Sequence, residues 1–300
     1  MYHLATILPG VRRVRIPLSR DQLMLLMMAT NLLFLAVDIY LAHMISGTIV
    51  PNEWIPIVFG VIGGILLLIA GLIAIKFRTL ASIIATLTFA VSIGVGLLGA
   101  YFHLVRGILP TAPMGERVSI DLLVWAPPIL GPLMFAMVGT LGLSAVWREE
   151  PPDSGRLTLW GSTRLQLPYP KTQAYFYIVG MAILATVISS VLDHARTNFS
   201  NPWLWIPTIA GIFGTAVAVT LGAINKPTRA DLITYFAAMV LLILVGIVGF
   251  LLHVNVNLIA DGTIVLERFI RGAPFMAPLL FANVGTIGLI ALLDPAEPQA

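Results

Sequence analysis

Long apolar segments alternate with short polar ones along the whole chain. Each apolar segment has about 20 residues or more, enough for a helix rising about 1.5 Å per residue to cross a hydrocarbon core of about 30 Å. We predict eight membrane-spanning helices, because lipid leaves no partners for free backbone groups and the alternation of a β-barrel strand is absent. The predicted spans are residues 22–45, 54–75, 80–105, 124–147, 173–194, 203–224, 231–254 and 272–293.

The second half of the chain repeats the first. PNEWIPIVFGVIGG (51–64) aligns with PWLWIPTIAGIFGT (202–215) at an offset of 151 residues. PILGPLMFAMVGTLGL (128–143) aligns with PFMAPLLFANVGTIGL (274–289) at an offset of 146, with ten identical residues. Four spans per half is an even number, so both halves enter the membrane in the same direction. We therefore expect an all-α membrane protein with two tandem, parallel-oriented four-helix repeats, residues 1–150 and 151–300, related by a pseudo-two-fold axis and joined by a linker at 148–171.

Charge patterning predicts how the chain lies in the membrane. Only 10% of residues are charged, against about 25% in soluble domains. Of the 17 Lys and Arg residues, 12 fall on the side that holds the N-terminus and five on the other. This bias predicts a multi-pass protein of the cytoplasmic membrane with both termini in the cytoplasm. The N-terminal segment is interpreted as a lead-in to the first span, not as a signal peptide. The net charge of +3 comes from loop arginines, so nucleic acid is not an expected partner.

Four of the five histidines form matched pairs between the halves. His43 aligns with His194 at an offset of 151 residues, and His103 aligns with His253 at an offset of 150. All four fall at the predicted outward ends of helices, and a matched carboxylate precedes the last span of each half. Two outward-facing sites are therefore predicted, each with two histidines and one carboxylate. They are His43, His103 and Asp121 in the first half, and His194, His253 and Glu267 in the second.

Two imidazoles with one carboxylate are typical of an open metal site. Copper, iron and zinc all accept this ligand set, and the sequence does not distinguish them. Asp38 and Asp193 are close enough in sequence to orient the imidazoles of His43 and His194. The leading hypothesis is metal binding, either for redox chemistry or as an accessory subunit of a membrane complex. Besides the lipid bilayer, the partners it implies are other membrane subunits or a redox partner on the outer side.

Two alternatives stay open. In the first, each histidine pair clamps a haem b, and the glycines of GLLGAYFH (96–103) and GIVGFLLH (246–253) make room for the macrocycle. In the second, the chain is a structural or transport subunit without a cofactor, and its histidines are exposed to water at the membrane surface and bind no ligand. Nucleotide-binding and hydrolase motifs are absent. The residues do not decide whether the protein is an enzyme.

Overall fold

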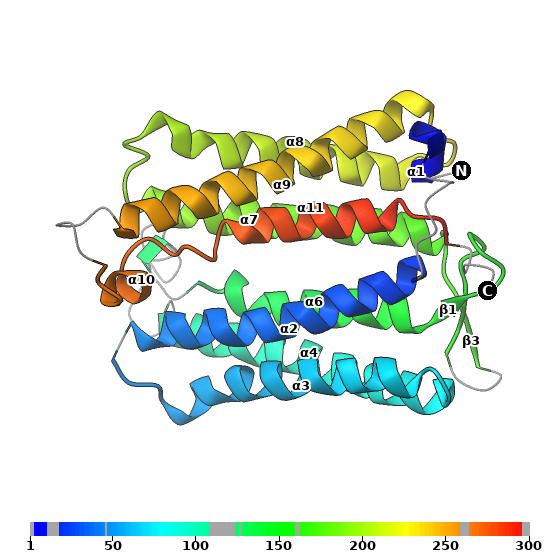
Figure 1. Cartoon of the computed structure of the whole chain (residues 1–300), viewed down its shortest axis with the longest axis horizontal. Coiled ribbons are helices and arrows are strands. Elements are labelled where there is room, and N and C mark those ends of the chain that lie inside the picture. The colour runs from blue at the N-terminus through cyan, green and yellow to red at the C-terminus, as the bar shows by residue number, and fades with distance from the viewer. Residues whose placement is uncertain are drawn as a thin grey trace.

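The computed structural model describes residues 3–10, 18–45, 47–107, 124–125, 128–159, 163–258 and 264–295. Within these ranges the main helices run along the long axis of the molecule in two groups (Figure 1). The first group consists of α2 (Arg20–Met44), α3 (Trp54–Ile73), α4 (Arg78–Gly107) and α6 (Leu130–Val146). The second group consists of α7 (Lys171–Ala195), α8 (Trp205–Ala223), α9 (Arg229–Leu258) and α11 (Leu279–Ala291). Two short helices, α1 (Leu4–Ile7) and α10 (Glu267–Arg271), lie at opposite ends of the second group.

Local sequence accounts for where these helices begin. Ser19 caps α2, because its hydroxyl accepts from the backbone N–H of Gln22 while the Gln22 side chain accepts from the Ser19 N–H. Thr228 and Asp231 form a similar reciprocal pair at the start of α9. Short 3-10 turns, η2 (Pro51–Glu53) and η3 (Pro202–Leu204), lead into α3 and α8.

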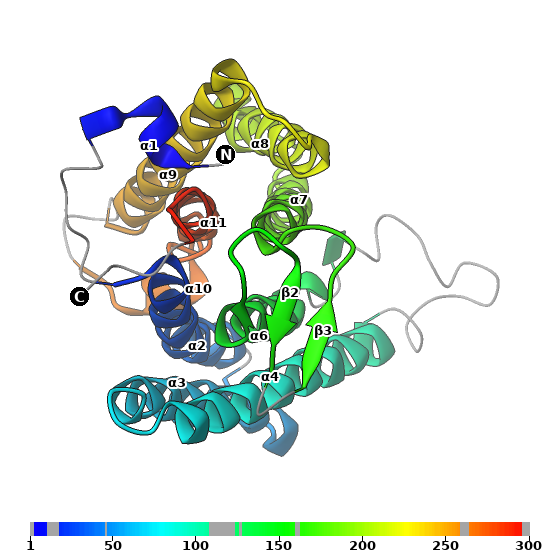
Figure 2. The ribbon, with the colours of Figure 1, turned by 90° about the vertical axis from the view of Figure 1, so that its right-hand side faces the viewer.

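Each group is a square bundle in which every helix packs against two neighbours. In the first, α2 and α4 both pack against α3 and α6 and lie diagonally opposite each other. In the second, α7 and α9 both pack against α8 and α11 and are likewise diagonal. The two groups meet through α6 with α7 and through α2 with α11 (Figure 2). One apolar core runs through both groups.

Glycines set the close approach between α4 and α6 and between α9 and α11. A Cβ added at Gly96 would lie 2.5 Å from the backbone N of Ala136, and one at Gly246 would collide with the backbone N of Ala282. A Cβ at Gly99 would meet a proline ring of α6 in the same way. The glycines before the histidines therefore serve helix packing, and the adjacent helix occupies the room that the haem hypothesis assigned to a macrocycle.

Six helices of the described part of the chain are long and apolar enough to cross a membrane. They are Arg20–Met44, Pro51–Ile73, Arg78–Val105, Lys171–Ala195, Pro202–Ala223 and Arg229–Leu258. Large apolar side chains face outward from them, such as Leu87 and Ile209, which are 62% and 65% exposed. A surface this apolar is suited to lipid. The chain is therefore a multi-pass membrane protein.

The two remaining predicted spans contain shorter helices. Residues 124–147 contain the 17-residue α6, and residues 272–293 contain the 13-residue α11. Prolines explain the late start of both. Pro128 and Pro274 precede the helices, and proline lacks a backbone N–H and disfavours helix in the residue before it.

The linker folds into a small sheet that the sequence analysis did not predict. Strands β1 (Arg148–Glu149), β2 (Arg156–Thr158) and β3 (Arg164–Gln166) pair antiparallel in the order β1-β2-β3. The sheet lies at one end of the molecule, together with both chain ends drawn in Figure 1. This end is called the linker end below. The opposite end, where α2, α4, α7 and α9 finish, is called the histidine end.

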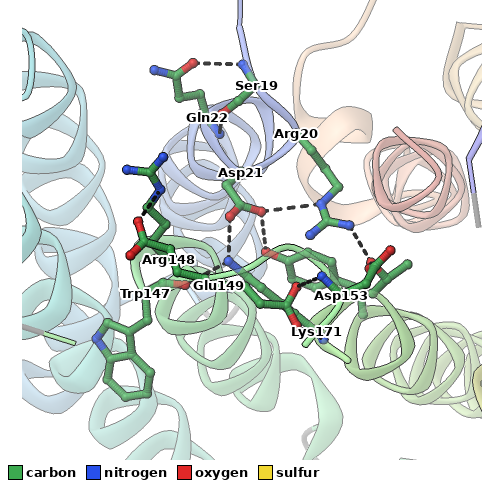
Figure 3. Close-up of polar contacts among 12 residues, drawn as sticks. Ser19, Arg20, Asp21, Gln22, Trp147, Arg148, Glu149, Asp153 and Lys171 are labelled. Carbon is green, nitrogen blue, oxygen red and sulfur yellow. Dashed lines mark hydrogen bonds and ion pairs between the residues drawn. The ribbon is translucent and has the colours of Figure 1, made fainter. Parts of the chain in front are cut away.

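A buried lysine joins the linker to both groups of helices. Lys171 is fully buried, and its ammonium donates to the Asp21 carboxylate and, at 2.8 Å, to the Trp147 carbonyl (Figure 3). The Glu149 carboxylate accepts from the backbone N–H groups of Lys171 and Gly155 at 2.9 and 2.7 Å. The start of α2, the end of α6 and the start of α7 are thereby held together.

Candidate metal centres at the histidine end

The structure brings the four matched histidines together as two pairs. The rings of His43 and His103 are 6.1 Å apart between centroids, with an interplanar angle of 72°. The rings of His194 and His253 are 6.5 Å apart at 78°. Each pair links the ends of two diagonal helices, α2 with α4 and α7 with α9. Both pairs are half-buried at the histidine end.

The Nδ1 atom of each ring is engaged. Those of His103 and His253 lie 3.0 Å from the carbonyl oxygens of Pro128 and Pro274. The Nδ1 of His43 lies 2.8 Å from a carbonyl of its own helix. A carbonyl only accepts, so in these three rings Nδ1 carries the proton and Nε2 carries the lone pair of the neutral imidazole. The Nδ1 of His194 lies 3.4 Å from the Ser190 hydroxyl. Metal-ligating histidines are held in this way.

The ring separations can be compared with those of two imidazoles that bind one metal ion. A metal–nitrogen bond is about 2.0–2.1 Å long and the ring centroid lies about 1.1 Å further back, which places trans imidazole centroids about 6.3 Å apart. Tetrahedral ligands would have centroids only about 5.2 Å apart by the same geometry. The observed 6.1 and 6.5 Å are closer to the longer of these separations, and the angles of 72° and 78° are those of an edge-to-face ring contact.

The predicted carboxylates do not join the histidines within the described chain. Asp121 lies outside the described residues. Glu267 forms an ion pair with Arg271 at 2.9 Å, and its side chain is 67% exposed. The part of the chain that the structure describes contains no group of three or more His, Asp or Glu residues suited to a metal ion. Two imidazoles per site are thus what the described residues bring together.

Some groups around the histidines were missed by the sequence analysis. Oε1 of Glu53 lies 4.0 Å from Nε2 of His43. The buried Asn257 forms two hydrogen bonds with the backbone of Ala273, which fixes the segment carrying the carbonyl that His253 uses. Pro128 and Pro274 align in the repeat, and this match was the sequence signal for the two carbonyls that His103 and His253 contact. Glu53 has a leucine at its aligned position, so the repeat gave no signal for it.

Neither aspartate expected to orient the imidazoles hydrogen-bonds a described histidine ring, although Asp193 lies close enough to His194 and His253 to interact with them electrostatically. Asp193 is 3.9 Å from Arg196, whose Nε donates to the Val124 carbonyl at 2.9 Å. Asp38 lines a cavity between the two groups of helices. The ring nitrogens are instead held by backbone carbonyls and one hydroxyl.

No protein-family model, curated protein sequence or solved structure matches this chain.

Proposed function

We propose that the protein is a membrane metalloprotein for electron transfer, with one metal centre held by each histidine pair. The observation that carries this proposal is that two pairs of half-buried imidazoles meet across diagonal helices with nearly equal ring separations. The anchored Nδ1 atoms support it, because they leave Nε2 as the ligating nitrogen. Electron transfer suits a site in which the protein supplies two imidazole ligands.

Haem b is the first candidate for the group that each histidine pair would hold. The two histidines of each pair would hold its iron, and the group would supply one-electron chemistry. The histidines would orient the group and, as neutral imidazoles, set the potential of its iron. The helix packing at Gly96 and Gly246 leaves no space for a macrocycle beside these two glycines.

A bare copper, iron or zinc ion is the second candidate, and Glu53 favours it in the first half. Its carboxylate is 4.0 Å from His43, so a small shift would make it a third ligand. Asp121 is the other candidate there. In the second half the corresponding carboxylate, Glu267, would have to leave its ion pair with Arg271.

We propose further that the chain crosses the cytoplasmic membrane eight times as two pseudo-symmetric repeats, 1–150 and 151–300. The equivalent contacts of Gly96 with α6 and of Gly246 with α11 support this arrangement. In it, α6 and α11 complete their crossings with the proline-containing segments that precede them. Both termini and the linker then face the cytoplasm, and the metal centres face outward toward a redox partner.

Metal analysis and absorption spectroscopy of the detergent-purified chain test the proposal. We expect two metal ions per chain, and for haem an absorbance band near 410 nm that shifts on reduction. His103→Ala and His253→Ala should each remove about half of the bound metal, because each removes one of two ligands of one centre.

His3→Ala is the matched control, because His3 is the one histidine outside the two pairs. It should leave the metal content unchanged. A folded wild-type chain without metal or visible absorbance would refute both candidates. Loss of all metal from a single substitution would instead show one shared centre.

A further inference from the structure

A cavity of about 180 Å³ lies between the two groups of helices. Residues from α2, α6 and α11 line it, so it lies on the interface between the two halves. Its walls are largely apolar and include Met27, Met134 and Leu280. Phe34 lines the outer edge of the cavity, is 54% exposed and faces the lipid side of the molecule. The cavity is therefore accessible from within the bilayer.

Three polar side chains in this cavity lack hydrogen-bond partners. Asn31 on α2, Asn283 on α11 and Asp38 form no hydrogen bond with any other residue that the structure describes. Asn31 is also only 9% exposed. Thr30, in the same wall, satisfies its hydroxyl by donating to the Leu26 carbonyl of its own helix. Polar groups inside a membrane need partners and mark functional sites when they line a cavity.

The size of the cavity selects a small occupant. A cavity of about 150 Å³ with an apolar lining holds one benzene ring. The present cavity is slightly larger and adds two amides from opposite halves. An amide both donates and accepts hydrogen bonds. The space therefore suits a single six-membered ring that carries an oxygen on each of two sides.

We infer that this cavity binds the head group of a membrane quinone. The carbonyl oxygens of the oxidised ring accept hydrogen bonds from the amide groups of Asn31 and Asn283. In the quinol form, the hydroxyl groups donate to the amide oxygens of the same residues. The methionine and leucine side chains cover the ring faces, and the apolar tail leaves past Phe34 into the lipid.

The aligned positions of the other half do not repeat this polarity. Asn31 aligns with Ala182 at the offset of 151 residues, and Asn283 aligns with Met137 at the offset of 146. The pair of amides is therefore present where α2 meets α11 and is not repeated where α6 meets α7. Substitution of each amide by its aligned residue gives a variant that the same kind of helix already tolerates.

Calorimetric titration of the full-length protein in lipid nanodiscs tests the inference. The probe is a p-benzoquinone with one prenyl unit, and empty nanodiscs give the background for partition into lipid. We expect saturable binding of one quinone per chain. Asn31→Ala and Asn283→Met should each weaken the affinity roughly tenfold, the effect of losing about one hydrogen bond.

Thr286→Val is the matched control on α11. Its hydroxyl donates to the Ala282 carbonyl and lies outside the cavity, so the affinity should not change. Binding no greater than in empty nanodiscs would overturn the inference, and so would equal affinities of the wild type and both asparagine variants. Equal binding of a prenyl alcohol without the ring would assign the site to lipid tails. The titration needs no metal, so its outcome is separate from that of the proposed function.

Discussion

Gly94 and Gly96 are two residues apart in α4 and have different surroundings. A Cβ at Gly96 would meet the backbone of α6, whereas one at Gly94 would have nothing within 4 Å. Gly96→Ala should therefore lower the free energy of unfolding by about 1–3 kcal/mol, because the backbone of α6 cannot move aside as a side chain can. Gly94→Ala should be neutral or stabilising, because alanine favours helix by roughly 0.5–1 kcal/mol. Melting temperatures of the two purified variants check this, and equal shifts would contradict it.

The histidines show how much of the candidate site could be predicted from single residues of the sequence. The matched spacing of His103 and His253 predicted that each would have a histidine partner at the same membrane level. The partners of their ring nitrogens were not predictable in the same way, because they are backbone carbonyls whose position depends on loop conformation. Glu53 was missed because it lies only ten residues after His43 and approaches it through a turn, not through helix periodicity.

At the scale of elements, the junction at the linker end depends on Lys171. Lys171→Met would leave the Asp21 carboxylate and the Trp147 carbonyl without their buried donor. Removing one partner of a fully buried charge pair costs roughly 3–5 kcal/mol. Asp21 is 27% exposed and keeps the Tyr175 hydroxyl and Arg20 as partners, so we expect a smaller loss but still a clear drop in melting temperature. Lys226→Met removes an exposed lysine and should leave the melting temperature nearly unchanged. The hypothesis fails if both variants melt at the same temperature.

Helix boundaries could be predicted where capping and hydropathy agree. The first span was expected at 22–45 and is found at Arg20–Met44. In the spans expected at 124–147 and 272–293 the helices α6 and α11 begin only at Leu130 and Leu279, because hydropathy alone ignores the effect of Pro128 and Pro274 on the backbone. The linker strands were missed because segments of two or three residues show no period-2 pattern.

At the scale of the whole molecule, the two ends differ in how they join the halves. A charged and largely buried network joins them at the linker end (Figure 3). Between the ends, α2 and α11 leave a cavity with unpaired polar groups. At the histidine end the two ring pairs stay within their own groups of helices. Each half therefore builds its own candidate centre, whereas the apolar core, the cavity and the junction at the linker end are common to both halves.

The absence of cysteine makes the orientation of the molecule directly measurable. Single cysteines at the exposed positions Asn52 and Leu266 mark the histidine end, and cysteines at Arg164 and Lys226 mark the linker end. In intact cells, a membrane-impermeant maleimide should label only the first two, because the excess of Lys and Arg predicts that the linker end lies in the cytoplasm. The other two should react after permeabilisation. If α6 did not cross the membrane, Arg164→Cys would be labelled from outside, on the same side as Asn52→Cys, and the eight-span arrangement would be wrong.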